Sequence, residues 1–236
     1  MWLATRNAKK GVELARILGV SFHVRTIGEL DALAPGKPPF EVVEDQPTFA
    51  GNARKKACET AAYCRALGID TRDLVLADDS GLCVDALNGA PGILSARYAG
   101  DDATDRDRID KLLRELTGVP PQSRGARFVC SLCLVHVASE PQSPEFEHEA
   151  EVRGVILEDA RGTGGFGYDP VFAPAREELA TLDHGPPSEG DEPWPRSFAE
   201  LDTAVKDHIG HRGRALAALC EHLNSAYPSA RAHQQE

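Results

Sequence analysis

The chain has no apolar run close to the roughly 18 residues that a membrane-spanning helix needs. Its first residues also lack the basic segment followed by an apolar segment that is typical of a secretory signal peptide. These two absences predict a cytoplasmic protein. The length of 236 residues and the 42% hydrophobic content are sufficient for one large globular α/β domain with a real core.

Positive charge is scarce relative to negative charge. The 26 Lys and Arg residues face 37 Asp and Glu residues, which gives a formal net charge of −11. Binding to a nucleic-acid polymer relies on basic surface that neutralises phosphates, so this balance argues against such a partner. Basic residues nevertheless gather in three short segments, at 6–10, 54–56 and 206–212. Convergence on a small polyanion is one explanation of this pattern, and solvated helix faces are the other.

The six cysteines lie mostly inside apolar segments, which in a reducing compartment predicts buried thiols rather than disulfides. Cys130 and Cys133 have the two-residue spacing of zinc ligands. They have no second pair nearby and lie within the apolar stretch from Phe128 to Val137, so a strand is favoured over a zinc site.

Hydrophobic periodicity and capping residues predict helices and strands along most of the chain. Helices are expected at residues 7–19, 48–67, 103–116 and 213–227, and strands at 2–4, 74–76, 127–137 and 149–157. Asn7 and Thr48 are the expected N-caps of the first two helices. Gly51 lies where a capping box would have Glu or Gln, which should weaken that first turn by about 1 kcal/mol. Residues 183–196 are expected to be an insertion loop and residues 228–236 a disordered tail.

Two adjacent carboxylates, Asp78 and Asp79, follow the predicted strand 74–76 and are expected to enter a turn. Ligands bind at such strand ends in open α/β sheets, and carboxylates can hold a divalent cation. A turn or N-cap aspartate pair is the structural alternative. On a continuous strand the two side chains would point in opposite directions, so that only one would face a metal. Glu44, just before the second helix, could supply another oxygen.

A second cluster, Thr5 to Lys10, lies between the apolar start of the chain and the first helix. Basic side chains and free amides at a helix N-terminus suit phosphate. Together with the carboxylates, this cluster predicts metal-assisted chemistry on a phosphorylated molecule.

Gly162, Gly164 and Gly167 match the dinucleotide-binding fingerprint as a string, but Pro170 follows where that fingerprint needs a helix. A loop that brings Phe166 and the nearby Tyr168 beside a ligand is the preferred interpretation. The segment 206–213 contains one Lys, two His and one Arg and suits phosphate or base contacts. A histidine metal site there is disfavoured because Mg²⁺ prefers carboxylates.

Taken in their order along the chain, the motifs resemble those of the inosine triphosphate pyrophosphatase family, the non-canonical purine nucleoside triphosphate pyrophosphatases. The resemblance spans nearly the whole chain. The motifs that carry it are Thr5-Arg6-Asn7-Ala8-Lys9-Lys10, Thr48-Phe49 with Asn52-Ala53 and Lys56, Ala77-Asp78-Asp79-Ser80-Gly81, Gly89-Ala90-Pro91-Gly92, Ser95-Ala96-Arg97-Tyr98, residues 162–170, and Lys206 with His211-Arg212-Gly213.

The resemblance implies an elongated, two-lobed α/β fold with a central mixed β-sheet flanked by helices and an active-site cleft between the lobes. Residues 1–227 would form this single domain, and a homodimer is the implied assembly. The implied activity is Mg²⁺-dependent hydrolysis of ITP, dITP and XTP to the nucleoside monophosphate and pyrophosphate, which cleanses the nucleotide pool.

The resemblance also implies roles for individual residues. Asp79 matches a catalytic and metal-binding aspartate, and Glu44 matches a second metal ligand. Lys10 and Lys56 are expected to act in catalysis by stabilising charge on the leaving pyrophosphate. The predicted substrate-binding residues are Thr5, Arg6, Asn7, Ala8, Lys9, Lys10, Lys56, Ser80, Phe166, Gly167, Tyr168, Asp169, Lys206, His211 and Arg212.

Three positions depart from the family pattern. Arg6 stands where the family often has Gly, Gly51 where many members have Glu, and Gly210 where Ser is usual. None of them alters Asp79 or Lys10, so activity is expected. The lost carboxylate at Gly51 motivates an alternative, a non-catalytic protein that binds or senses purine nucleotides. A general phosphatase that releases orthophosphate is a second enzyme hypothesis.

Overall fold

The computed structural model describes residues 1–18, 23–138, 143–180 and 195–227. The chain divides into two compact units, one of residues 1–79, 130–149 and 215 onward, the other of residues 80–129 and 150–214. The predicted insertion at 183–196 falls almost entirely outside the described residues, and the predicted tail at 228–236 falls wholly outside them. No helix in the described part is long and apolar enough to cross a membrane.

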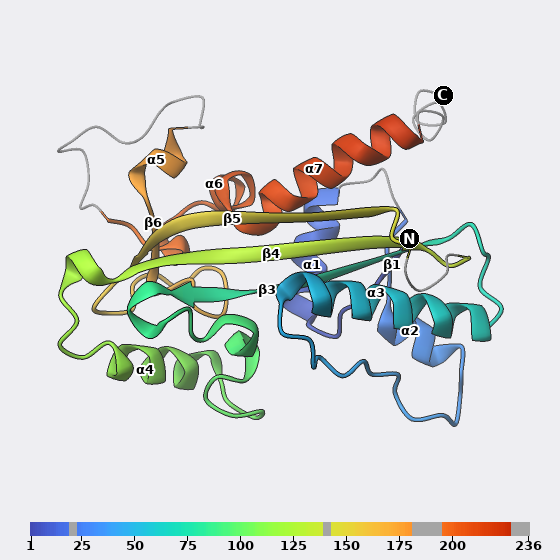
Figure 1. Cartoon of the computed structure of the whole chain (residues 1–236), viewed down its shortest axis with the longest axis horizontal. Coiled ribbons are helices and arrows are strands. Elements are labelled where there is room, and N and C mark those ends of the chain that lie inside the picture. The colour runs from blue at the N-terminus through green and yellow to red at the C-terminus, as the bar shows by residue number, and fades with distance from the viewer. Residues whose placement is uncertain (19–22, 139–142, 181–194, 228–236) are drawn as a thin grey trace. The chain divides into compact units, whose positions relative to one another are not determined.

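Six strands of the described chain form one mixed, open sheet in the order β2-β1-β3-β4-β5-β6 (Figure 1). The strands are β1 (Trp2–Leu3), β2 (Arg25–Thr26), β3 (Leu74–Val84), β4 (Gly125–His136), β5 (Phe146–Ile156) and β6 (Phe172–Pro174). β1 runs parallel to both β2 and β3, whereas β6 runs antiparallel to β5. Parallel neighbours need long crossover connections, and here helices α1, α2 and α3 occupy them.

All four predicted helices are present, with ends within two residues of those expected. The described helices are α1 (Ala8–Leu18), α2 (Ile27–Ala32), α3 (Phe49–Ala66), α4 (Asp105–Glu115), α5 (Arg176–Leu179), α6 (Thr203–Ile209) and α7 (His211–Ala226). Asn7 caps α1, because its Oδ1 accepts hydrogen bonds from the backbone amides of Lys9 and Lys10 at 3.0 and 3.2 Å. Thr48 caps α3 by accepting from Gly51 N at 3.0 Å. Both predicted N-caps are therefore confirmed.

The predicted turn at Asp78 and Asp79 is wrong. β3 continues through both residues from Leu74 to Val84. A strand can carry two adjacent buried carboxylates because successive side chains point to opposite faces, where each can have its own cationic partner. The structure agrees instead with the expectation for a continuous strand, in which the two side chains point in opposite directions.

The core of the first unit forms where α2 and α3 pack on one face of the sheet. β3 and β4 contribute residues in alternation, including Val75, Ala77, Cys133 and Val135, against small residues of α3 such as Ala57. Small side chains allow the helix to approach the strands closely. Cys130 and Cys133 both lie buried in β4 as free thiols, which confirms the predicted strand at this pair.

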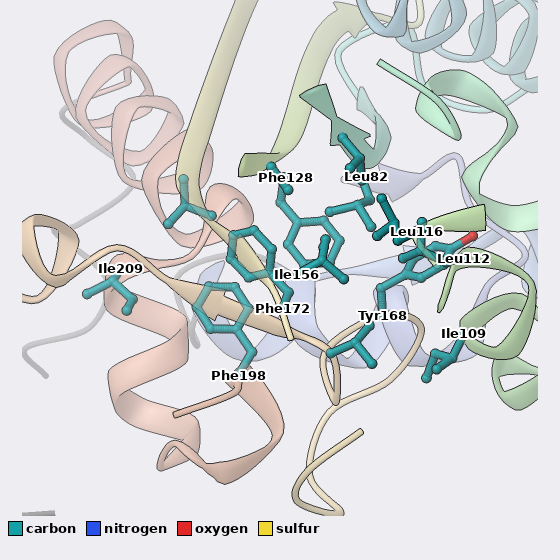
Figure 2. Packing of buried hydrophobic residues seen from close by; sticks show 14 of the residues in the cluster. Leu82, Ile109, Leu112, Leu116, Phe128, Ile156, Tyr168, Phe172, Phe198 and Ile209 are labelled. Carbon is teal, nitrogen blue, oxygen red and sulfur yellow. The ribbon is translucent and has the colours of Figure 1, made fainter. Parts of the chain in front are cut away.

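The core of the second unit is built around aromatic rings (Figure 2). Phe172 lies at the centre, with ring centroids 4.7 Å from Phe128 and 5.0 Å from Phe198. Leu112 of α4 and Ile209 of α6 join the same cluster. This core holds the ends of β4, β5 and β6 and the segments that carry the later sequence motifs.

Candidate active site

Asp78 and Asp79 each hold a lysine from a different helix. Lys10 Nζ of α1 lies 3.0 Å from Asp78 Oδ2, and Lys56 Nζ of α3 lies 3.1 Å from Asp79 Oδ1. Because neighbouring residues of a strand face opposite ways, α1 and α3 present their lysines to opposite faces of β3. The structure thus brings together four residues of the sequence motifs and assigns them to two separate ion pairs.

Lys56 also joins Asp79 to Glu44. Its Nζ lies 2.9 Å from Glu44 Oε1, so one ammonium bridges both predicted metal ligands. Asp79 and Lys56 are 5% and 8% exposed. Burial raises the pKa of Asp79 above its ordinary range, although Lys56 and Lys10 act in the opposite direction. The pKa of Lys56 is raised in turn, because Asp79, Asp78 and Glu44 together outweigh the lowering effect of its burial.

Asn52 completes this cluster and was not among the predicted site residues. It is fully buried in α3. Its Nδ2 donates to Asp79 Oδ2 at 3.1 Å, and its Oδ1 accepts from Gln46 N at 3.0 Å. Asn52 therefore connects Asp79 to the segment that carries Glu44. Its spacing of four residues from Lys56, one helical turn on the same face, is the sequence signal that could have identified it.

The residues of the predicted phosphate cradle lie around the start of α1. Thr5 Oγ1 accepts from the backbone amide of Asn7 at 3.2 Å, and Ala8 begins the helix. Lys9 and Lys10 follow in its first turn. This arrangement of a capped helix N-terminus with basic side chains is suited to an anion.

Arg6 makes contacts of a different kind. Its Nη2 lies 2.9 Å from Asp31 Oδ2 and its Nε donates to the carbonyl oxygen of Phe40 at 3.0 Å. Asp31 also accepts from Phe40 N at 3.0 Å, and this backbone hydrogen bond, with the bond from Arg6, lowers the pKa of Asp31. Arg6 thereby fastens the loop before α1 to the segment that leads to Glu44.

The second unit contains a buried carboxylate with a lysine partner. Asp169 is 3% exposed, and its Oδ2 accepts from Lys206 Nζ and from Phe166 N, both at 2.7 Å. Burial raises the pKa of Asp169, with Lys206 opposing that shift. Gly165 allows this geometry, since it has a φ of +69° and an added Cβ would lie 2.0 Å from Asp169 Oδ2.

The ring of Phe166 lies beside two cations, one from α6 and one from α7. Lys206 Nζ and Arg212 Cζ are each 5.1 Å from the centroid of its ring. Arg212 also donates from Nη2 to Ser80 Oγ at 2.9 Å. The buried ring of His211 stacks on Phe128 with centroids 4.8 Å apart. The predicted residues from three distant motifs therefore gather in this unit.

Tyr168 differs from its expected role. Its ring belongs to the hydrophobic core, and its hydroxyl donates to Ser95 O at 3.0 Å (Figure 2). Tyr168 is 4% exposed, so its ring cannot stack on a base, and at this residue only the backbone is left for ligand contact. The segment 162–170 leads into β6 and not into the helix that a dinucleotide-binding turn needs.

The predicted metal site offers two carboxylates as donor groups, those of Glu44 and Asp79. No set of three or more His, Cys, Asp or Glu side chains in the described ranges is arranged to hold a metal ion. Mg²⁺, however, keeps several waters and binds through one or two carboxylates plus substrate phosphates. Glu44 and Asp79 already share one cation, the Lys56 ammonium, so their oxygen atoms suit such a two-carboxylate site.

Comparison with known proteins places this arrangement in a family of α/β proteins. The Ham1 family profile matches residues 1–222. The chain is 41% identical over 221 residues to a dITP/XTP pyrophosphatase from Opitutus terrae, covering 93% of this chain and 96% of that protein. It is 41% identical over 226 residues to one from Desulforamulus reducens, covering 95% and 96%. The solved structure of a HAM1 protein from Coxiella burnetii gives a TM-score of 0.73 at 33% identity, covering 95% and 98%.

The chain therefore belongs to the Ham1 family. The relationship to nucleoside triphosphate pyrophosphatases that the motifs predicted is confirmed, as is the predicted α/β class with a mixed sheet flanked by helices.

Proposed function

We propose that this protein hydrolyses dITP, XTP and ITP to the nucleoside monophosphate and pyrophosphate. The names of relatives that match more than nine-tenths of the chain support this activity. The observation that carries the proposal is the buried cluster in which Lys56 bridges Asp79 and Glu44. Such a cluster of opposite charges in a buried environment is suited to holding a triphosphate and a cation.

In this mechanism Lys10 and Lys56 contact the phosphates and stabilise the negative charge that leaves with pyrophosphate. Asp79 orients and deprotonates the water that attacks the α-phosphorus. Burial raises the pKa of Asp79, which is the direction that makes its carboxylate a stronger base. Glu44 and Asp79 would hold Mg²⁺, which when bound neutralises charge on the triphosphate.

We assign base recognition to residues of the second unit. Lys206 and Arg212 supply donors for a keto group of the purine, and Phe166 supplies a ring beside them. A site built on specific hydrogen bonds rejects other bases because they leave its buried polar groups without partners. Asp79 and Ser80 are consecutive residues of β3. The homodimer and the cytoplasmic location remain predictions.

Product analysis tests the proposal directly. The purified protein is incubated with Mg²⁺ and, separately, dITP, XTP, ITP, GTP and ATP, and the products are separated by chromatography. We expect monophosphate and pyrophosphate from the first three and little turnover of the last two. Diphosphate and orthophosphate would identify a phosphatase instead. Tight binding without turnover would favour the non-catalytic binding or sensing protein.

A further inference from the structure

The hydroxyl of Tyr168 makes a buried hydrogen bond within the second unit. The ring of Tyr168 belongs to the same aromatic core as Phe172 (Figure 2). Its hydroxyl donates to the backbone carbonyl oxygen of Ser95 at 3.0 Å. Burial raises the pKa of Tyr168 above its ordinary value, so the hydroxyl keeps its proton at neutral pH and remains a donor. A buried tyrosine hydroxyl needs such a partner, and here the partner lies 73 positions earlier in the chain.

Ser95 is itself held in place by its side chain. It is buried, and its Oγ accepts a hydrogen bond from the backbone amide of Leu82 at 2.9 Å. The same hydroxyl donates to the carbonyl oxygen of Gly92 at 2.6 Å. Leu82 lies in β3, two residues beyond Ser80. The carbonyl oxygen that accepts from Tyr168 is therefore fixed relative to β3.

Tyr168 lies in the loop that carries Phe166, the ring proposed to lie beside the purine. Asp169 follows Tyr168 directly. Gly165 and Gly167 flank Phe166 and have φ angles of +69° and +63°. Glycine adopts such conformations without strain but has more backbone freedom than other residues, so the loop by itself restrains the Phe166 ring weakly. The restraint has to come from contacts with the rest of the unit, and the Tyr168 hydroxyl makes one of them.

We propose that Ser95 and the Tyr168 hydroxyl form a positioning pair that sets the base selectivity of this protein. The inference rests on the proposed function. The pair acts through the loop, because it keeps the Phe166 ring and Asp169, the partner of Lys206, where they exclude other purines. A loop released from the pair can shift, and its polar groups can then find partners on a wrong base. The rival explanation is that this hydrogen bond only stabilises the core.

The test compares dITP with dGTP, two nucleotides whose bases differ by one amino group. Steady-state kinetics of the wild type and of Tyr168→Phe give kcat/KM for each substrate. The ratio of kcat/KM for dITP to that for dGTP should fall about fivefold or more in Tyr168→Phe, the scale of one hydrogen bond. KM for dITP should rise more than kcat falls, because the pair acts on the base and not on the reacting phosphate. The thermal unfolding midpoint of each protein is measured in parallel.

Tyr98→Phe is the matched control. Tyr98 belongs to the same unit, and its hydroxyl donates to Glu115 and not to the loop. Both substitutions remove one hydroxyl and one hydrogen bond, so a general loss of stability should affect the two variants alike. We expect the wild-type ratio in Tyr98→Phe. An equal fall of the ratio in both variants would support the rival explanation and overturn the proposal.

Ser95→Ala tests whether the two residues act as a pair, because it removes both side-chain hydrogen bonds that hold the Ser95 backbone. It should also lower the ratio, and the double variant with Tyr168→Phe should lose little more than the stronger single variant. Losses that simply multiply would show that the two residues act separately and would overturn the pairing. If Ser95→Ala does not fold, Tyr168→Phe and its control decide alone.

Failure of this inference can be told apart from failure of the proposed function. Selective hydrolysis of dITP by the wild type, with the same selectivity in Tyr168→Phe, would overturn the inference and leave the proposed function intact. Absence of dITP hydrolysis by the wild type would overturn the proposed function. The ratio of the dITP and dGTP dissociation constants, measured by calorimetry on the same proteins, would then test the pair, and an equal ratio in wild type and Tyr168→Phe would overturn it.

Discussion

Asn52 Nδ2 donates a hydrogen bond to Asp79 Oδ2 at 3.1 Å, and the same side chain accepts from the backbone amide of Gln46. The remaining carboxylate oxygen of Asp79 lies 3.1 Å from Lys56. Asn52 and Lys56 together therefore fix both oxygen atoms of the proposed catalytic carboxylate. Asn52 is a positioning residue in this view, because it acts through Asp79.

Asn52→Ala should lower kcat for dITP about 10- to 100-fold, the range measured when partners that orient an essential ligand are removed. KM should change less, because Asn52 makes no proposed contact with substrate. Steady-state kinetics with dITP and Mg²⁺ measure both quantities. Thr60→Val is the matched control, since Thr60 is buried two turns further along α3, and it should leave kcat unchanged. If both variants lose activity only in proportion to the folded protein that they lose, the positioning role is contradicted.

Asp79→Asn should reduce kcat by about 10²- to 10⁴-fold, the contribution expected of a general base, while the shape of the cluster is kept. Binding of ITP is measured by calorimetry on the same variant and should persist, because Lys10 and Lys56 remain. Asp85→Asn, at an exposed carboxylate after the end of β3, serves as the control. Turnover close to the wild-type rate in Asp79→Asn would refute the proposed mechanism.

Two explanations of Arg6, which stands where the family often has Gly, predict different experimental results. If Arg6 acts by fastening the segment before Glu44, Arg6→Gly and Asp31→Asn should both raise the Mg²⁺ concentration needed for half-maximal activity by several fold, because each removes the same ion pair. Activity measured over a range of Mg²⁺ concentrations tests this.

The family resemblance implies instead that Arg6 contacts the triphosphate. This role predicts a different outcome. Arg6→Gly would then raise KM for dITP, whereas Asp31→Asn would not. Arg72→Gly, at a mostly exposed arginine, is the control for loss of one surface cation and should match the wild type.

Local sequence patterns predicted the long helices and the N-caps of α1 and α3, because periodicity and N-cap chemistry act within a few residues. They did not predict the continuous β3, since the side chains that partner Asp78 and Asp79 are 68 and 23 positions away, at Lys10 and Lys56. The contacts of Arg6 were missed for the same reason. The family resemblance could place residues in roles, but the pairing of side chains across elements is a property of the folded chain.

Gly213 and Gly11 should respond to alanine in opposite ways. A Cβ at Gly213 in α7 would lie 1.6 Å from the carbonyl oxygen of Asp207, so Gly213→Ala forces α6 and α7 apart and should cost roughly 2 kcal/mol or more. A Cβ at Gly11 in α1 meets nothing closer than 3.9 Å, so Gly11→Ala should stabilise by about 0.5–1 kcal/mol. Urea unfolding of the two variants measures both changes. Equal effects would show that helix propensity alone decides the outcome.

Cys133 should make the free energy of unfolding fall at alkaline pH. Burial and the nearby Glu147 raise the pKa of this thiol from its ordinary value of 9.0 to about 12. The unfolded chain therefore loses the proton first, and the stabilising contribution, complete below pH 9, is lost as the pH rises toward 12. At pH 10 this loss is about 1 kcal/mol. Urea unfolding at pH 8 and pH 10 should show a smaller decrease in Cys133→Val than in the wild type. An equal decrease in both proteins would mean that the Cys133 thiol ionises as readily in the folded protein as in the unfolded chain.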